Sequence, residues 1–262
     1  MSNQYWAERI AKAQSKLTNK SIRQTEAQLK KYYAKAMKKT LDEFEKTYNK
    51  VLLSIDEGRE PTPADLYKLD TYWQLQAQLR AELQRLGDRQ IVLLSKNFEM
   101  HFFDVYYSFG LPGEKAFSTI DTAGANALIN QIWVADGKSW SQRIWDNTEL
   151  LLQTLNDSLV ECVVTGKKTS ELKNILQERF GVSYSRADAL VRTELAHVQT
   201  QAATQRYKDY GIQEVEILAD EDERRCEVCG DLHKKRYPIG AHVPIPAHPR
   251  CRCCVVPVVE IE

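Results

Sequence analysis

The cysteine residues of this sequence are unevenly distributed, and their spacing is typical of a metal site. Five of the six lie between Cys226 and Cys254. In Cys226-Glu-Val-Cys229 a gap of two residues lets both sulfur atoms point at one ion from a tight turn. His248-Pro-Arg-Cys251 repeats that spacing with one imidazole. Two such turns joined by a loop predict a tetrahedral Zn²⁺ site formed by Cys226, Cys229, His248 and Cys251.

The two cysteines that follow leave the ligand set open. Neighbouring residues of a strand point to opposite faces, so at most one of Cys253 and Cys254 can easily face the ion. Cys253 could replace His248 or Cys251 as a ligand, whereas Cys254 is expected to pack as a small hydrophobic residue. Disulfides are the alternative if the protein is exported or exposed on a virion, and free buried thiols are a third interpretation.

The same region does not predict a catalytic metal. A catalytic zinc keeps an open coordination position beside a general base. The side chains available for that role follow no spacing that is typical of a hydrolase or a deaminase: Glu227, Asp231, His233 and His242. We therefore expect a structural zinc and no enzyme activity.

The overall composition narrows the class of protein. Lys and Arg together number 36, as do Asp and Glu, so the net charge is zero and a surface devoted entirely to nucleic acid is disfavoured. No apolar run approaches the length of a transmembrane helix, and the first residues lack the pattern of a signal peptide. Synthesis in a reducing cytosol is therefore expected, which favours zinc over disulfides.

The N-terminal residues predict a long helix. No Gly or Pro occurs from Asn3 to Ile55, and good helix formers predominate. The second half has an apolar seam with steps of four and three residues, typical of packing against another helix: Met37, Leu41, Phe44, Tyr48, Val51 and Ile55. The first half, to about Leu29, is polar almost all round. We expect it to be an arm with too few partners in the chain's own core, mobile until a partner orders it.

The charge of this region indicates what that partner is. Residues 1–50 carry twelve Lys or Arg and five Asp or Glu, so the segment has a net charge of +7. DNA phosphates or an acidic protein face would complement this charge. A solvated helix face is the simpler interpretation.

The rest of the chain is expected to be helical apart from a small C-terminal module. Gly87 and Gly181 are expected to end helices, and Gly110-Leu-Pro-Gly113 to form a linker. The predicted helices are 63–86 (capped by Thr62), 88–109, 122–133, 139–164, 169–180 and 183–210. Strands are predicted at 215–218 and 255–261, the second at a sheet edge because it contains Pro257. The predicted fold is mainly α: a long N-terminal helical arm and bundle (1–111), a second helical region (112–211) and a small α+β zinc-stabilised C-terminal lobe (212–262).

One turn of the last long helix carries a further polar group. Arg192, Thr193 and Glu194 are followed by His197, and Glu-x-x-His puts two metal ligands on one helical face. Such a site needs further carboxylates from other helices. We therefore favour a polar cluster of Arg192 and Glu194 that anchors the helix.

Taken in order, these motifs resemble the C-terminal domain of the phage Mu F-like minor head proteins, also called head-morphogenesis proteins. The resemblance rests on Leu190-Val-Arg-Thr-Glu194, on Asp222-x-x-x-Cys226-x-x-Cys229, and on His248-Pro-x-Cys251-Arg-Cys253. The chain departs from the family pattern at Cys254, where a small or polar residue is usual.

The resemblance implies a structural protein of a tailed phage or prophage, present in few copies inside the head. It implies association with the portal, with the major capsid or scaffold protein as a further partner, and a role in procapsid assembly, DNA packaging or delivery. The basic arm adds double-stranded DNA as a candidate partner, and no membrane is expected. The implied location is the virion, after assembly in the host cytoplasm. The alternatives are a zinc-dependent hydrolase or nuclease and a zinc-module nucleic-acid-binding regulator.

Overall fold

The computed structural model describes residues 3–53, 62–108 and 119–259. The chain forms two units: unit 1 consists of residues 1–26, 93–140 and 189–262, and unit 2 of residues 27–92 and 141–188. Three helices contribute several residues to each unit: α1 (Asn3–Leu53), α3 (Asp70–Tyr106) and α6 (Thr169–Asp209). A fourth, α5 (Trp140–Val164), contributes only its first residue, Trp140, to unit 1. The three-part division at residues 111 and 211 stays a prediction, and the predicted linker at 110–113 lies outside the described residues.

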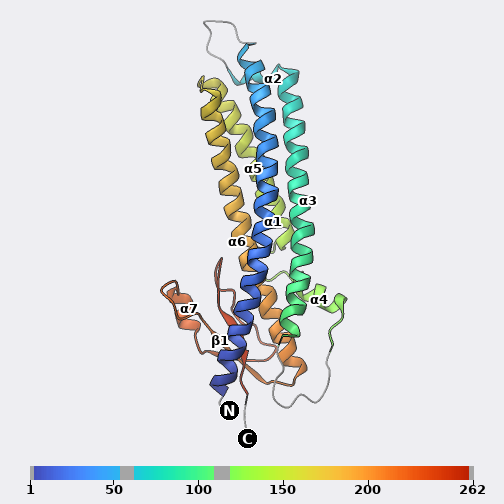
Figure 1. The fold of residues 1–262 in the computed structure, drawn as a ribbon, viewed down its shortest axis with the longest axis vertical. Coiled ribbons are helices and arrows are strands. Elements are labelled where there is room, and N and C mark those ends of the chain that lie inside the picture. The colour runs from blue at the N-terminus through green and yellow to red at the C-terminus, as the bar shows by residue number, and fades with distance from the viewer. Residues whose placement is uncertain (1–2, 54–61, 109–118, 260–262) are drawn as a thin grey trace. The chain divides into compact units, whose positions relative to one another are not determined.

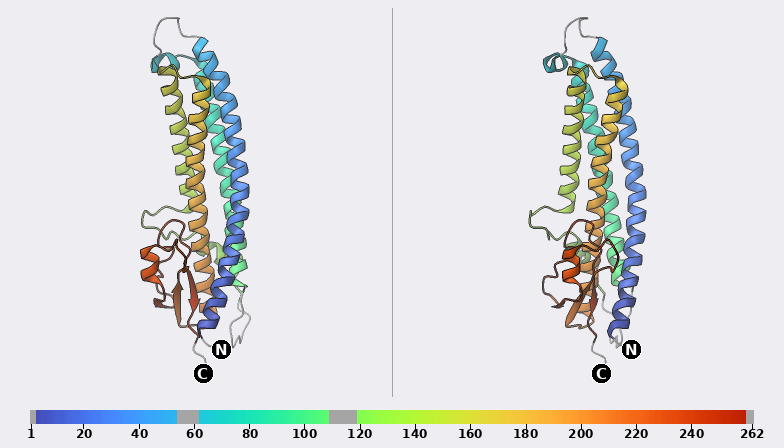
Figure 2. Two further views of the ribbon diagram at one scale, coloured as in Figure 1. Left: turned by 60° about the vertical axis from the view of Figure 1, so that its left-hand side comes forward. Right: turned by 90° about the vertical axis from the view of Figure 1, so that its left-hand side faces the viewer.

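Unit 2 is a helical bundle whose main segments run side by side in Figures 1 and 2. These segments are residues 27–53 of α1, 70–92 of α3, 169–188 of α6, and α5 (Trp140–Val164) from Ser141 onward. The predicted seam of α1 lies in its core, where Phe44, Tyr48 and Val51 are buried. The Tyr48 hydroxyl donates to the carbonyl of Cys162 over 3.1 Å and so ties α1 to α5.

The predicted cap at Thr62 is confirmed, although the helix that it begins is short. The Asp65 carboxylate accepts from the backbone N–H of Thr62 at 2.9 Å and from its hydroxyl at 2.7 Å. This pairing gives a partner to a backbone donor at the start of the helix. α2 (Pro63–Tyr67) ends after five residues, however, and α3 begins at Asp70.

Two of the predicted helix ends are wrong, because α3 passes through Gly87 and α6 passes through Gly181. A Cβ atom on Gly87 would lie 2.5 Å from Cζ3 of Trp145, so the glycine lets this α5 indole approach the α3 backbone. Gly181 is exposed and has open space around it, and its helix is held by buried neighbours such as Phe180 and Ser183. Tertiary packing outweighs the roughly 1 kcal/mol that a glycine costs inside a helix.

Unit 1 joins helical segments to a small sheet. The helical segments are residues 3–26 of α1, 93–106 of α3, 189–209 of α6, and α4 (Thr122–Ile129). The sheet is antiparallel, in the order β2-β1-β3, with β1 (Glu214–Leu218), β2 (Arg236–Pro238) and β3 (Cys254–Pro257). Between β1 and β2 the chain forms α7 (Glu227–Leu232). β3 lies at a sheet edge, as Pro257 predicts, and it is shorter than the predicted strand.

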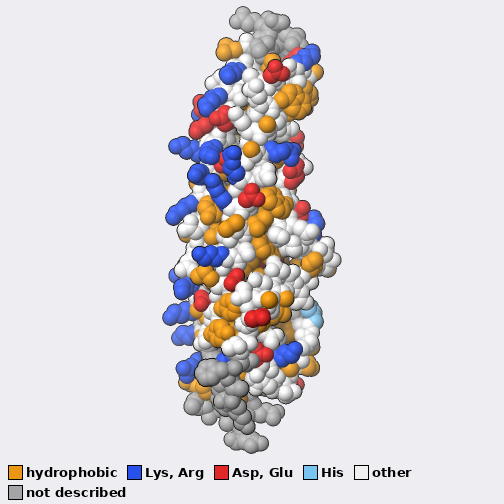
Figure 3. All heavy atoms as spheres, turned by 90° about the vertical axis from the view of Figure 1, so that its right-hand side faces the viewer, with side chains coloured by type: hydrophobic (Ala, Val, Ile, Leu, Met, Phe, Trp, Pro, Cys, Tyr) orange, Lys and Arg blue, Asp and Glu red, His pale blue; other side chains and the backbone are white. Residues whose placement is uncertain are grey.

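The mainly α fold with a small C-terminal sheet is therefore confirmed. Figure 3 shows one face of the molecule, on which both basic and acidic side chains are exposed, in keeping with their equal numbers in the sequence. Among the described residues, no helix combines the length and the apolar character that crossing a membrane requires.

The first half of α1 is not the free arm that its polarity predicts. Ala7 and Ile10 are buried in unit 1, and Gln14 is fully buried. The Gln14 amide donates to the Tyr207 hydroxyl at 2.8 Å and to the Val255 carbonyl at 3.0 Å. The arm is thereby bound to both α6 and the edge strand β3, so the prediction that it lacks partners in its own chain is wrong.

Buried hydrogen bonds continue along the same face of α1. The Gln199 amide donates to Gln14 Oε1 at 3.2 Å, and the Thr18 hydroxyl donates to Gln199 Oε1. Thr18 Oγ1 also lies 3.2 Å from Nε2 of the buried His101, whose Nδ1 is 3.1 Å from Ser21 Oγ. A polar face can be buried when its groups have partners. A search for apolar positions cannot detect such a face, because the partners lie far away in the sequence.

Candidate metal centre

The first two predicted donors lie at the start of α7. Cys226 is the N-cap residue in extended conformation, and its sulfur accepts the backbone N–H of Cys229 at 3.4 Å. Cys229 is buried in the first turn of the helix, and Cys226 is exposed. The two-residue gap in the sequence thus corresponds to a helix start that turns both sulfur atoms toward one place.

The other donors come from the segment that leads into β3. His248 Nδ1 lies 2.8 Å from the carbonyl of Pro249, and this contact orients the ring. His248 Nε2 therefore faces α7, at 3.3 Å from Cys226 Sγ and 3.1 Å from Cys229 Sγ. The Cys251 sulfur lies 3.8 Å from Cys229 Sγ.

The donor atoms form two groups that share Cys229. Within each group they all lie within 4.8 Å of one another: Cys226, Cys229 and His248 in one, and Cys229, Cys251 and Cys253 in the other. Cys254 belongs to neither group and is buried. The structure thus places all five predicted donors in two adjoining groups, each of which could hold a metal ion, and neither group contains all four predicted ligands.

Three distances within this cluster can be compared with those around a tetrahedral zinc ion. Zinc sits about 2.3 Å from sulfur and about 2.0 Å from imidazole nitrogen, which places neighbouring sulfurs about 3.8 Å apart and sulfur and nitrogen about 3.5 Å apart. The separation of 3.8 Å between Cys229 Sγ and Cys251 Sγ equals the first value. The separations of 3.1 and 3.3 Å from His248 Nε2 are slightly shorter than the second. Thiolate and imidazole donors are also those that zinc prefers.

Hydrogen bonds and burial give the cysteines of this cluster different thiol pKa values. The Cys253 side chain lowers the pKa of Cys251 to about 5 by hydrogen bonding, and the same bond raises the pKa of Cys253. The N–H of Cys229 lowers the pKa of Cys226 by donating to its sulfur. Burial raises the pKa of Cys229 to about 12. Metal ligands must be thiolates, so Cys226 and Cys251 are the readiest of these donors.

Arg252 holds the two chain segments of the cluster together, a role that its sequence position did not reveal. Its guanidinium donates to Asp222 at 2.5 and 2.6 Å and to Asp220 at 2.9 Å. The hydrogen bond from Arg252 holds the pKa of the Asp222 carboxyl well below its usual range. The segment before Cys226 is thereby clamped to the segment between Cys251 and Cys253. The signal in the sequence is the Arg between two cysteines, together with Asp222 four residues before Cys226.

The Arg192–Glu194 turn of α6 connects this module to the rest of unit 1. The Arg192 guanidinium donates to the Glu26 carboxylate of α1. The Thr193 hydroxyl oxygen accepts the backbone N–H of Arg250, next to Cys251, at 3.0 Å. One helical turn therefore contacts both the first part of α1 and the metal-binding loop.

The same turn also contacts the segment before α5. The Glu194 carboxylate accepts from the Trp133 indole N–H at 3.1 Å, and the ring of His197 stacks on Trp133 with centroids 4.5 Å apart. Burial lowers the pKa of His197 to about 4. Glu194 and His197 belong to neither group of candidate metal-binding side chains among the described residues. This arrangement agrees with an anchoring polar cluster in place of a second metal site.

Comparison with known proteins returns one family. Residues 153–256 match the family described as Phage Mu protein F like protein. No curated protein and no solved structure matches the chain. The matched residues include the Arg192–Glu194 turn, the sheet apart from Pro257, and all five donors. Residues 153–256 are therefore similar to the phage Mu F-like family, as the resemblance in the sequence indicates.

Proposed function

We propose that the protein is a minor head protein that sits at the portal inside the phage head and acts in procapsid assembly and in DNA packaging or delivery. The observation that carries this proposal is the family match, which spans the α6 turn and the whole cysteine module. The family is structural. The five donors of this chain also favour a structural metal over a catalytic one. A catalytic zinc keeps one position for water, and five protein donors can fill all four positions.

The proposed metal is one structural Zn²⁺ held by Cys226, Cys229, His248 and Cys251. Cys253 would lie beside the ion as a further donor that hydrogen-bonds to Cys251. The short strands and the six-residue α7 offer little apolar area for an independent core. The ion would supply the missing stability by joining the start of α7 to the loop before β3.

The proposed additional partner is double-stranded DNA, bound through its phosphates. The support is a groove of about 2090 Å³ in unit 1, lined on one side by the first turns of α1. Lys12, Lys16, Lys20 and Arg23 line it from α1 at helical spacing, and each is exposed. Basic side chains of the cysteine module line it as well, including Lys234, Arg236 and Arg250. Such a basic groove would bind phosphates without reading base sequence.

The test of the proposed function is to locate the protein in particles of the phage that encodes it. Mass spectrometry of purified procapsids and mature heads should find the chain in both, at few copies per particle, and it should copurify with the portal. A variant with Ser at Cys226 and Cys229 should be incorporated poorly if the metal module is the docking element. Absence of the wild-type chain from procapsids and heads would overturn the proposal.

The metal itself can be tested on the isolated protein. Metal analysis after purification under reducing conditions should find about one zinc per chain. Cys226→Ser should lose the metal. Cys254→Ser is the matched control, because Cys254 is buried next to Cys253 but belongs to neither donor group. Equal zinc content in both variants would contradict the assignment of the ligands.

A further inference from the structure

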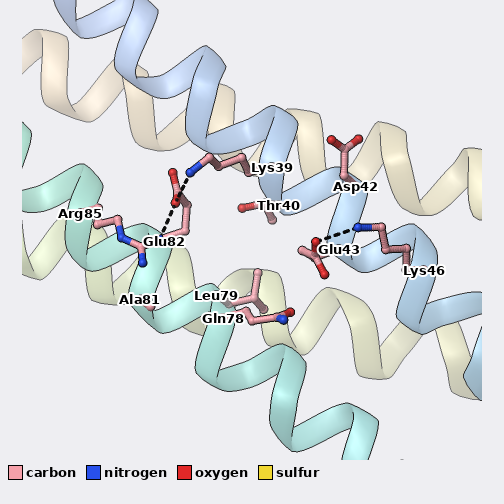
Figure 4. Close-up of a pocket in the computed structure, with 10 residues that line it drawn as sticks. All are labelled: Lys39, Thr40, Asp42, Glu43, Lys46, Gln78, Leu79, Ala81, Glu82 and Arg85. Atoms are coloured by element: carbon pink, nitrogen blue, oxygen red, sulfur yellow. Dashed lines mark hydrogen bonds and ion pairs between the residues drawn. The ribbon is translucent and has the colours of Figure 1, made fainter.

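A hollow of about 360 Å³ opens between α1 and α3 in unit 2, which contains none of the metal donors. Its volume is comparable to that of a small ligand pocket and is many times the roughly 30 Å³ of one water molecule. Figure 4 shows two of its side chains, Thr40 of α1 and Glu82 of α3, lying between the two helices. Both are buried, with exposed fractions of 2% and 6%.

Each of these two side chains has a polar atom without a partner. Glu82 Oε2 accepts from Lys39 Nζ at 3.0 Å and from Arg85 Nη1 at 3.1 Å, as Figure 4 shows. Glu82 Oε1 and Thr40 Oγ1, however, are buried and make no hydrogen bond. Leaving such an atom unpaired costs roughly 1–3 kcal/mol, so two of them in one hollow indicate that something binds there.

Among the described threonine hydroxyls that are fully buried, those of Thr40 and Thr204 have no hydrogen-bond partner. Other threonines inside the helices donate to the carbonyl four residues earlier: Thr25, Thr148, Thr154, Thr193 and Thr200. That bond is the ordinary solution for a buried threonine in a helix. Thr40 makes no such bond, and its side chain lines the hollow.

The charges around the hollow decide the chemistry of the ligand. Three basic side chains (Lys39, Lys46, Arg85) and three acidic ones (Asp42, Glu43, Glu82) line it, so neither a cation nor an anion is favoured overall. A carboxylate oxygen only accepts hydrogen bonds, so the ligand must present a donor to Glu82 Oε1. A hydroxyl can donate, so the ligand can present an acceptor to Thr40 beside that donor.

We propose that this hollow binds a neutral primary amide group, whose N–H₂ donates to Glu82 Oε1 and whose carbonyl accepts from the Thr40 hydroxyl. The group can belong to a free small amide or to a Gln or Asn side chain of a polypeptide. The proposal does not depend on the head-protein function, because it concerns residues of unit 2 outside the matched family region.

The experiment uses the full chain with methyl-labelled Ala, Leu and Thr, observed by NMR during titration with three probes of nearly equal shape. The probes are acetamide (neutral), acetate (anionic) and acetamidinium (cationic). Acetamide should shift the methyl signals of Thr40, Leu79 and Ala81 saturably, with a dissociation constant in the millimolar range or weaker, as expected of about four heavy atoms. Acetate should bind at least about tenfold more weakly, because it has no N–H to donate to Glu82 Oε1. Acetamidinium should also bind more weakly than acetamide, because it has no acceptor for the Thr40 hydroxyl hydrogen.

Two threonine variants provide the matched comparison. Thr40→Val removes the unpaired hydroxyl and should weaken acetamide binding about tenfold, read from the Leu79 and Ala81 methyls. Thr148→Val removes a buried hydroxyl of unit 2 that already has its partner, and should leave the affinity unchanged. N-acetylglutamine methylamide distinguishes the two sources of the amide group. If it binds as tightly as acetamide, the ligand is a polypeptide side chain. If only acetamide binds, the ligand is a free small amide. The absence of a saturable acetamide shift, or an equal one in Thr40→Val, would overturn the proposal.

Discussion

We predict opposite changes in stability when each of the two helical glycines of unit 2 is replaced with alanine. Gly87 lies in α3, where a Cβ atom would meet Cζ3, Cη2 and Cε3 of Trp145 at 2.5, 2.9 and 3.0 Å. Gly181 lies in α6, where a Cβ atom would meet nothing within 4 Å. Replacing each glycine with alanine therefore changes the local helix propensity in the same way and the packing in opposite ways.

The magnitudes follow from these two terms. Alanine gains about 1 kcal/mol over glycine inside a helix, partly because it restricts the unfolded chain. Gly181→Ala should keep that gain and stabilise the protein by about 0.5–1 kcal/mol. In Gly87→Ala the new methyl overlaps a rigid indole, and overpacking of this kind costs about 1–3 kcal/mol. The net effect should be a destabilisation of about 1 kcal/mol, so the two variants should differ by roughly 2 kcal/mol.

Urea denaturation followed by circular dichroism at 222 nm measures this difference directly, provided that the slopes of the transitions agree. In thermal unfolding, 1 kcal/mol corresponds to about 2–4 °C for a chain of this size, so the midpoints should lie on opposite sides of the wild type. A double variant, Gly87→Ala with Trp145→Leu, should recover part of the lost stability, because the smaller side chain can yield. If Gly87→Ala is as stable as Gly181→Ala, close packing of Trp145 does not explain the glycine.

Three further predictions concern the metal, pH and DNA. Chelation should unfold the cysteine module and remove near-ultraviolet signal while most helical signal remains, because unit 2 has its own apolar core. The pKa of His101 is lowered by burial from 6.5 to about 4, so between these values the unfolded chain binds a proton that the folded chain does not. Stability should therefore fall by about 3 kcal/mol as the pH drops from 6.5 to 4, and less in His101→Gln, as equilibrium unfolding at several pH values would show. Replacing the three groove lysines Lys12, Lys16 and Lys20 with Gln should weaken sequence-independent DNA binding and lower the slope of affinity against salt by about 3 in a filter-binding assay. The control is the same triple replacement at Lys30, Lys31 and Lys35.

The parts of the fold that sequence reasoning predicted depend on local patterns. The seam through Phe44 and Tyr48 repeats at helical spacing, and Pro257 restricts its strand to an edge whatever its neighbours are. The errors arise where a distant residue decides. Nothing near Gly87 in the sequence reveals that Trp145 packs on it. Likewise Gln14 reads as a solvated residue until Tyr207 and Val255 provide its partners.

In the candidate site, too, local spacing predicts some features, and others depend on residues far apart in the sequence. The spacing within each pair of donors is local, so Cys226 with Cys229 and His248 with Cys251 could be predicted as ligands from the sequence. That the two pairs meet depends on the sheet, because β1 and β3 bring the segments on either side of α7 together. The Arg252 clamp on Asp222 was missed, because the Arg between two cysteines is a weak signal and a charged turn before a cysteine pair has no fixed partner.

The contacts of unit 1 also predict that metal binding is felt in the first part of α1. Thr193 contacts the metal-binding loop at Arg250, and the adjacent Arg192 contacts Glu26. A second connection runs from Gln14 to Val255 in β3, directly after Cys254. If chelation releases the loop and the edge strand, both connections lose one end. The amide N–H of Gln14 that donates to Val255 would then be left unpaired, although Tyr207 and Gln199 still bond to Gln14, and an unpaired buried donor costs roughly 1–3 kcal/mol.

Hydrogen exchange measures this coupling with an internal control. Amides of residues 3–26 should exchange faster after zinc is removed, because local opening there becomes less costly. Amides of residues 27–53 belong to the same helix but to unit 2, so their protection should change little. Unchanged protection of residues 3–26, in protein whose cysteine module has visibly unfolded, would mean that α3 and α6 hold the start of α1 without the module. The buried hydrogen bonds of Thr18 and Ser21 to His101 would then be sufficient to keep it in place.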